Sequence, residues 1–129
     1  MDTEPQRKNK RKKTVMEQNK GRKDDFKDGK LRWDLLPLDL IEMIVEVYDF
    51  GARKYAPDTW KQLEDGENRY RGALLRHLVE HEKGNLRDKE SGLLHAQHLC
   101  WNAIALLHFA IEKEKESQKE LLSLRTFLP

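Results

Sequence analysis

Four histidines and an asparagine in the second half of the chain have spacings that place side chains on one face of a helix. His77 and His81 are four residues apart; His95 and His98 are three apart, and Asn102 follows four residues later. Residues three or four apart are neighbours on a helix surface. If two antiparallel helices carry these segments, the imidazoles converge on one pocket, where neutral ring nitrogens could ligate a divalent metal ion. The alternative is that each is an ordinary, partly buried histidine on a helix face.

A run of carboxylates offers a second place for a metal ion. Glu42, Glu46 and Asp49 are spaced by four and three residues, so they share one face of a predicted helix. Carboxylate oxygens are ligands that hard cations prefer. The alternative is that these three side chains form a solvated acidic surface.

Three helices are predicted to position these residues, over residues 37–54, 67–83 and 92–115 or further. Apolar residues recur at three- and four-residue spacing in each segment, which is typical of helices that bury one face. Pro37 suits a helix start, Gly84 suits a helix end, and Ser91 suits the N-cap of the third helix. The predicted fold class is all-α, with three main helices and a loop-rich N-terminal lead-in.

The third predicted helix is apolar nearly all round in its first half, so we expect it to be the most buried one. Cys100 lies in this stretch and is predicted to be buried. Three helices provide a thin core for one small chain. We therefore expect a homo-oligomer in which other copies complete a helical bundle.

Composition divides the chain into three parts. Residues 1–23 carry nine Lys or Arg and three Asp or Glu without an apolar pattern, which predicts a basic disordered tail. Residues 24–118 form the predicted all-α domain, and residues 119–129 form an apolar C-terminal tail that folds back or packs on another subunit. The basic tail is expected to make at most weak, nonspecific contact with nucleic acid.

The compartment is predicted from two features. A single cysteine, Cys100, excludes an intramolecular disulfide and suits a reducing cytosol. The N-terminus has no secretory pattern, and the longest apolar run is too short and too polar to span a bilayer. We expect a cytoplasmic protein that does not enter a membrane.

Four ordered motifs resemble a known family. They are KDGKLRWDLLP, FGARKYAPDTW, RYRGALLRHL and GNLRDKESGLLHAQHLCWN, and together they cover about residues 27–110. This set resembles the phage dATP/dGTP diphosphohydrolase family, which is similar to the MazG-like all-α nucleoside triphosphate pyrophosphohydrolases. The resemblance implies metal-dependent cleavage of a deoxypurine triphosphate to monophosphate and pyrophosphate. Where MazG-like enzymes carry a glutamate-rich ligand set, this chain has RHLVEHE and HAQH, so imidazoles replace carboxylates.

The resemblance implies roles for individual residues. The predicted catalytic residues are Glu80, His77 and Asp88. The predicted metal ligands are His77, Glu80, His95 and His98, for Mg²⁺ or for the softer Mn²⁺ or Co²⁺. The predicted substrate-binding residues are Lys30, Lys54 and Arg76 for phosphate, Tyr55 and Trp60 for stacking on the base, and Asn102 for its edge. The same residues would serve a non-catalytic protein that captures a nucleotide or a nucleotide signal, as a phage counter-defence binder would.

Overall fold

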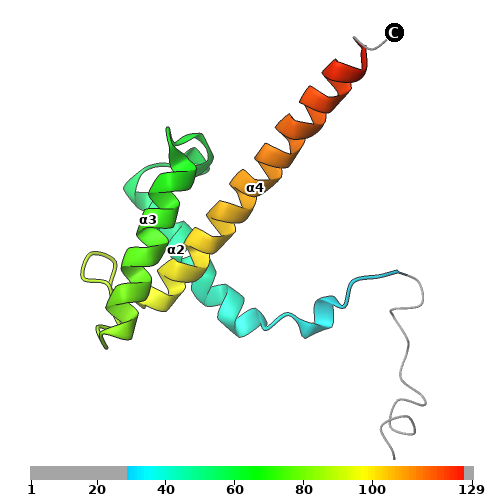
Figure 1. Cartoon of the computed structure of the whole chain (residues 1–129). Helices are drawn as coiled ribbons and strands as arrows, with labels where there is room; N and C mark the ends of the chain where they lie inside the picture. The colour runs from blue at the N-terminus through cyan, green and yellow to red at the C-terminus, as the bar shows by residue number, and fades with distance from the viewer. Residues whose placement is uncertain (1–28, 127–129) are drawn as a thin grey trace, which may run out of the picture. The chain divides into compact units, whose positions relative to one another are not determined.

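The computed structural model describes residues 29–126, and the chain divides between Leu36 and Pro37 into two units. Figure 1 shows the elements, which in order are η1 (Trp33–Leu35), α2 (Leu38–Lys54), η2 (Thr59–Gln62), α3 (Gly66–Glu82) and α4 (His95–Thr126). The helices account for all regular elements of residues 29–126, which confirms the all-α prediction. The predicted basic tail, residues 1–23, lies outside the described residues, as do the first residues of the lead-in.

The described part of the first unit is a short lead-in around the 3₁₀ turn η1. The Arg32 guanidinium donates two hydrogen bonds to the Asp34 carboxylate, at 2.8 and 2.6 Å. This ion pair lowers the pKa of Asp34. The neighbouring side chains of Leu31, Trp33 and Leu35 are exposed.

Helix α2 has the bounds that the sequence predicts, to within one residue. Pro37 is its N-cap, and the carbonyl oxygen of Pro37 accepts the first helical hydrogen bonds, from Leu40 and Ile41. Arg53 and Lys54 lie in the last turn, where positive charge interacts favourably with the helix dipole.

Helix α3 ends in a glycine motif. Gly84 has a φ of +89°, and the hydrogen bonds from Gly84 N to His81 O and from Asn85 N to Glu80 O close the helix. This is the Schellman arrangement, in which a left-handed glycine satisfies the last carbonyl groups. The prediction that Gly84 ends the helix is confirmed.

The connection between α3 and α4 is a hairpin-like turn. Arg87 and Leu94 form an antiparallel bridge, and Asp88 N donates to Leu93 O at 2.8 Å. The hairpin turns at Gly92, whose φ is +73°. These backbone bonds hold residues 86–94 out of the helix, so the prediction of a helix start at Gly92 with Ser91 as N-cap is wrong.

Helix α4 instead begins at His95, with Gln97 as the residue that closes its first turn. The Gln97 carboxamide accepts a hydrogen bond from Leu94 N at 2.9 Å, as the third helical residue does in a capping box. Its Nε2 donates to Met43 O at 2.7 Å, which ties the start of α4 to the middle of α2. Helix α4 then continues through the predicted apolar tail as far as Thr126.

The core lies where α4 packs between α2 and α3, and α4 contributes most of the buried residues (Figure 1). Aromatic rings fill it. Trp101 contacts Tyr48, Trp60 and Tyr70 edge-on, with centroids 5.3 to 5.8 Å apart. Trp101 Nε1 is buried and has no hydrogen-bond partner among residues 29–126.

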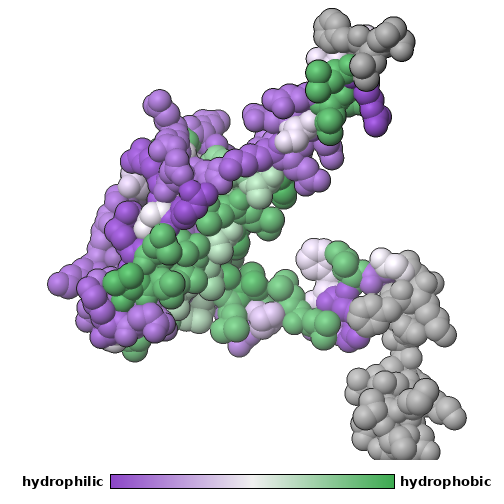
Figure 2. Space-filling model, in the orientation of Figure 1, coloured by the Kyte–Doolittle hydropathy of each residue, from purple (hydrophilic) through white to green (hydrophobic). Residues whose placement is uncertain are grey.

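The apolar core of the described residues is small. Val47 and Ala105 are its buried hydrophobic residues, whereas leucines, isoleucines and valines on all three helices are exposed. Figure 2 shows apolar surface over α2 and the first half of α4. Cys100 is exposed, so its predicted burial is wrong: α4 packs through the stripe that holds His98 and Asn102, and Cys100 lies on the opposite stripe. None of the helices described has an apolar stretch long enough to cross a bilayer.

Candidate functional site

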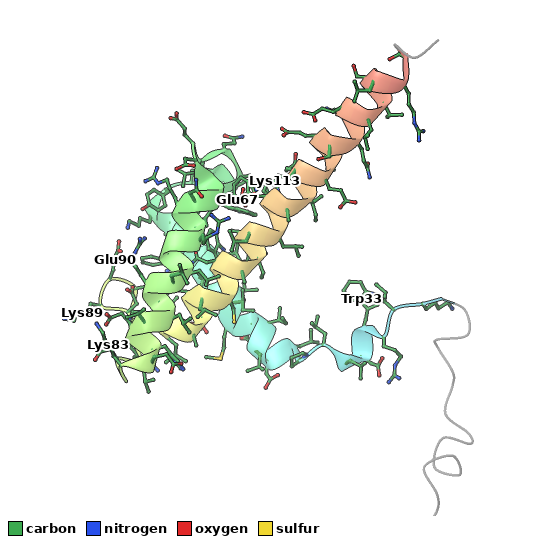
Figure 3. The ribbon with its side chains drawn as sticks, in the orientation of Figure 1. Trp33, Glu67, Lys83, Lys89, Glu90 and Lys113 are labelled. Atoms are coloured by element: carbon green, nitrogen blue, oxygen red, sulfur yellow. The ribbon has the colours of Figure 1, made fainter. Side chains whose placement is uncertain are left out.

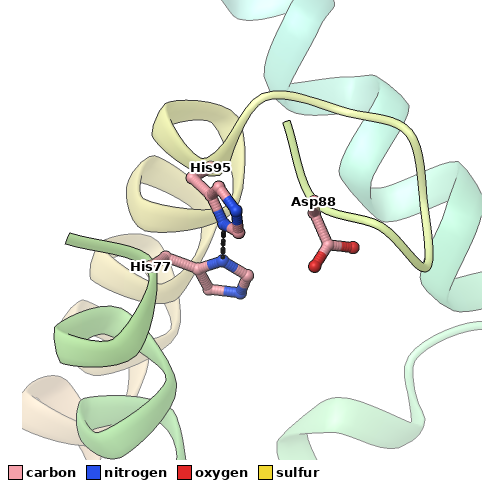
Figure 4. Close-up of side chains that lie close together, drawn as sticks. All are labelled: His77, Asp88 and His95. Atoms are coloured by element: carbon pink, nitrogen blue, oxygen red, sulfur yellow. Dashed lines mark hydrogen bonds between the residues drawn. The ribbon is translucent and has the colours of Figure 1, made fainter. Parts of the chain in front are cut away.

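Three of the predicted histidines converge, and they come from α3 and the start of α4. His77 Nδ1 and His95 Nδ1 are 2.8 Å apart (Figure 4). The His98 ring lies face to face with the His77 ring, at a centroid distance of 4.6 Å and an interplanar angle of 8°. The fourth histidine of the predicted set, His81, makes none of these contacts.

The hairpin between α3 and α4 brings a carboxylate to the same place. His77, Asp88 and His95 each offer a ligand atom within 4.8 Å of the others, which makes them a candidate metal-binding group (Figure 4). Asp88 Oδ2 accepts hydrogen bonds from Ser91 N and Ser91 Oγ, both at 2.9 Å. The Ser91 hydroxyl is also 2.7 Å from His98 Nε2.

The electrostatics favour the neutral form of two of these imidazoles, His77 and His98. Burial, reinforced by the neighbouring His98 and His95 rings, lowers the pKa of His77 to about 4. Burial also lowers the pKa of His98. Burial alone would raise the pKa of Asp88, but the hydrogen bonds from Ser91 and the nearby imidazoles lower it. His77 therefore offers a ring lone pair, and Asp88 an ionised carboxylate, near neutral pH.

A cavity of about 680 Å³ opens beside this group. It is lined by residues from α2, the loop after it, η2, α3, the hairpin and α4, all of them in the second unit. Its polar residues include Arg69, Arg76, His77, Asp88 and His98, and its rings include Tyr48, Tyr55, Trp60, Tyr70 and Trp101. A cavity of this size suits a small organic ligand, since such pockets span about 300–1,000 Å³.

The basic residues of the cavity differ in their partners. Lys54 at the end of α2 forms an ion pair with Glu90 of the hairpin, which raises the pKa of Lys54. Figure 3 shows Glu90 on that turn beside α3. Arg76 is exposed and has no ion pair among residues 29–126, so its guanidinium is available to an anionic ligand.

The remaining predicted residues lie in different environments. Asn102 is 4% exposed, and its Nδ2 donates to His98 O at 2.8 Å. Trp60 packs its ring against Tyr48 and Trp101, whereas the Tyr55 side chain is largely exposed.

One predicted residue of the second unit is not brought to the cavity. Glu80 does not line it, because the Glu80 carboxylate accepts a hydrogen bond from Asn85 and lies 3.6 Å from Lys83 Nζ. Lys30 belongs to the lead-in, which is a separate unit.

The acidic residues of α2 do not form a comparable group. Asp49 pairs with Arg53, and Glu42 and Glu46 are exposed. Within residues 29–126, the metal-binding group found is the one that contains His77.

Sequence reasoning did not assign Arg69 or Ser91 to the site. Arg69 could have been found, because it lies seven residues before Arg76 and therefore on the same face of α3. Ser91 carried no such signal, since the fold of the hairpin decides where its side chain points.

The donor set fits a divalent metal ion. Its two imidazoles and its carboxylate are of the types that bind Mn²⁺, Co²⁺ and Zn²⁺. The 2.8 Å between the two Nδ1 atoms is close to the separation of adjacent ligands around one ion, about 3 Å for bonds of about 2.1 Å. The low pKa of His77 removes the competition from protons above about pH 4.

Comparison with known proteins gives two matches. Residues 20–119 match the family model described as dATP/dGTP diphosphohydrolase, N-terminal. A protein of Salmonella phage PMBT28 named dATP/dGTP diphosphohydrolase is 36% identical over 73 residues, which are 57% of this chain and 24% of that protein. The chain thus spans about a quarter of the length of this relative. No solved structure matches.

Proposed function

The chain belongs to the dATP/dGTP diphosphohydrolase, N-terminal, family, and on this premise we propose that it hydrolyses a deoxypurine nucleoside triphosphate with a divalent metal ion. Water and the triphosphate would give the monophosphate and pyrophosphate. The observation that supports this best is the group of His77, Asp88 and His95 beside a cavity lined with aromatic and basic side chains.

The aromatic part of the cavity would bind the base. Trp60 and Tyr55 line it and present ring surface for stacking on a purine. Asn102 Nδ2 is already bonded to the carbonyl oxygen of His98, which leaves Asn102 Oδ1 as an acceptor. Adenine and guanine both carry an exocyclic amino group that can donate to such an oxygen.

The basic part would bind the triphosphate. Arg76 can bond two phosphate oxygens at once through its guanidinium, and Arg69 lies two helical turns before it on the same face. Lys54 would join them after exchanging Glu90 for a phosphate oxygen. These side chains would neutralise the substrate and orient its phosphates toward the histidine group.

His77, His95 and Asp88 would hold the metal ion. When bound there, the ion supplies charge neutralisation on phosphate oxygens and lowers the pKa of a bound water. The low pKa of His77 keeps its ring in the neutral form that such a role requires. Glu80, a predicted catalytic residue, does not line the cavity and makes no contact among residues 29–126 that supports a role in proton transfer.

A second function is favoured by one observation. In residues 29–126 the metal-binding group holds a single carboxylate, Asp88, and the predicted base Glu80 lies away from the cavity. A protein that captures a purine nucleotide without hydrolysing it needs the cavity and the basic residues but no base.

A test for nucleotide hydrolysis distinguishes the hydrolase from the nucleotide-binding protein. We would incubate the purified chain with dATP, dGTP and the other nucleoside triphosphates in Mg²⁺, Mn²⁺ or Co²⁺, and separate the products by ion-exchange chromatography. Metal-dependent release of monophosphate and pyrophosphate, lost in His77→Ala and kept in His81→Ala, would support the hydrolase. Tight nucleotide binding by calorimetry without any product would support the binding protein.

A further inference from the structure

The Ser91 hydroxyl is the junction of a hydrogen-bond network beside the candidate metal ligands. It contacts Asp88 Oδ2 at 2.9 Å, His98 Nε2 at 2.7 Å and Leu93 N at 3.2 Å. We propose that Ser91 is a positioning residue: it fixes Asp88 to ligate the ion through Oδ1, and it keeps His98 outside the ligand set. This inference rests on the metal site of the proposed function.

The direction of each hydrogen bond follows from the chemistry of the groups. An ionised carboxylate can only accept, so the single hydroxyl hydrogen of Ser91 points to Asp88. The backbone N–H of Leu93 donates to the hydroxyl oxygen. His98 must therefore donate to the same oxygen, which requires a hydrogen on His98 Nε2. That nitrogen has no lone pair left for a metal ion, and the ligand atoms that meet at the candidate site come from His77, Asp88 and His95.

The two oxygen atoms of the Asp88 carboxylate have different hydrogen-bond partners. Its Oδ2 atom accepts from both the backbone N–H and the hydroxyl of Ser91. Its Oδ1 atom has no hydrogen-bond partner among the described residues and is the oxygen left for an ion. Hydrogen bonds of this kind orient a ligand, and their loss typically weakens metal binding about 10- to 100-fold.

In this proposal His98 affects the metal site by holding the His77 ring in place. Its ring is anchored by Ser91 at one edge and lies parallel to the ring of His77. A fixed ring on one face of His77 limits the orientations that the His77 imidazole can take. This contact is consistent with His77 presenting Nδ1 toward His95.

The first test uses the metal-free protein and needs no activity. In ¹⁵N-histidine-labelled protein, the ring nitrogen shifts of His98 should report a hydrogen on Nε2 in the wild type. The Ser91→Ala variant should give a mixture of the two tautomers, whereas Ser91→Thr, which keeps the hydroxyl, should resemble the wild type. A wild-type His98 that carries its hydrogen on Nδ1 would overturn the inference.

The second test measures Mn²⁺ affinity by calorimetry. Ser91→Ala should bind Mn²⁺ about 10-fold more weakly or worse, because the backbone N–H still holds Asp88 but the hydroxyl is gone. Ser91→Thr and the surface control Ser123→Ala should stay close to the wild type. His98→Phe, which keeps a flat ring, should retain most of the affinity, whereas His77→Ala should lose it.

Each outcome bears on one claim. Loss of Mn²⁺ binding in His98→Phe equal to that in His77→Ala would make His98 a ligand and overturn the inference, as would a wild type that binds no Mn²⁺. Ser91-dependent Mn²⁺ binding in a protein that hydrolyses no nucleotide would uphold the inference and remove the proposed hydrolase.

Discussion

His77 and His98 stack face to face across the contact between α3 and α4, with their rings 4.6 Å apart and within 8° of parallel. Two imidazoles can be held this closely without mutual repulsion when neither is charged. Burial is the main cause of the low pKa of each ring. The stack therefore links the protonation of the site to the packing of the two helices.

We predict that the metal-free protein loses stability as the pH falls from about 6.5 to about 4. In the unfolded chain His77 titrates near 6.5, whereas in the folded chain its pKa is about 4. Between these values the unfolded state binds more protons, so acid favours unfolding. His98 acts in the same direction. After discounting for solvent screening at this half-buried ring, we expect a loss of roughly 1–2 kcal/mol.

Urea unfolding at several pH values in the presence of a chelator would measure this. The His77→Gln variant should show a flatter dependence, and His81→Ala should keep the slope of the wild type. Equal stability of the wild type at pH 7 and pH 5 would contradict a neutral, buried stack.

Replacing each of two glycines with alanine should change the free energy of unfolding in opposite directions. A Cβ at Gly66 would lie 2.6 Å from Phe109 Cζ, in the contact between the start of α3 and α4, whereas a Cβ at Gly51 would meet nothing within 4 Å. Gly66→Ala should destabilise by about 1–3 kcal/mol because the Phe109 ring must move. Gly51→Ala should stabilise by up to about 1 kcal/mol, the difference in helix propensity. Thermal unfolding of both variants would measure this, and the prediction fails if their effects have the same sign.

The sequence predicts the helix ends where local chemistry decides them, as at Pro37 and Gly84. It misplaces the start of α4 because the bridge between Arg87 and Leu94 withdraws residues that would otherwise suit a helix. It misplaces Cys100 for another reason. The first half of α4 carries two apolar stripes, and only the packing of α3 and α2 decides which one is buried.

The candidate site was predictable to a similar degree. Helical spacing placed His77, His95 and His98 together, because regular helices fix the relation between their side chains. Whether Glu80 or Asp88 supplies the carboxylate of the site depends on the hairpin. The conformation of the hairpin comes from backbone hydrogen bonds and a left-handed Gly92. No periodicity encodes that geometry, so the contact of Ser91 with Asp88 could not be assigned from the sequence.

The ion pair of Lys54 and Glu90 should compete with substrate. If Lys54 binds phosphate as proposed, it must leave Glu90, so Glu90→Gln should lower KM by no more than a few-fold, because an exposed ion pair is weak. Lys54→Ala should raise KM. Arg53→Ala removes a neighbouring charge that pairs with Asp49 instead, and it should leave KM unchanged. Steady-state kinetics would measure these effects, and a higher KM in Glu90→Gln would show that Glu90 supports substrate binding.

The exposed stripe of α4 should pair with a second copy of the chain. Cys100, Ile104, Leu107 and Ile111 follow one another at intervals of four, three and four residues and are all exposed. This is the spacing of the contact seam between packed helices. An uncovered stripe of this length is unfavourable in water, and the small core gives little stability to offset it. We therefore predict a dimer or a larger oligomer at micromolar concentration, measured by light scattering. Leu107→Glu should shift the mass to that of the 15.3 kDa monomer, whereas Lys119→Glu, on the free end of α4, should not. A monomeric wild type would contradict the prediction.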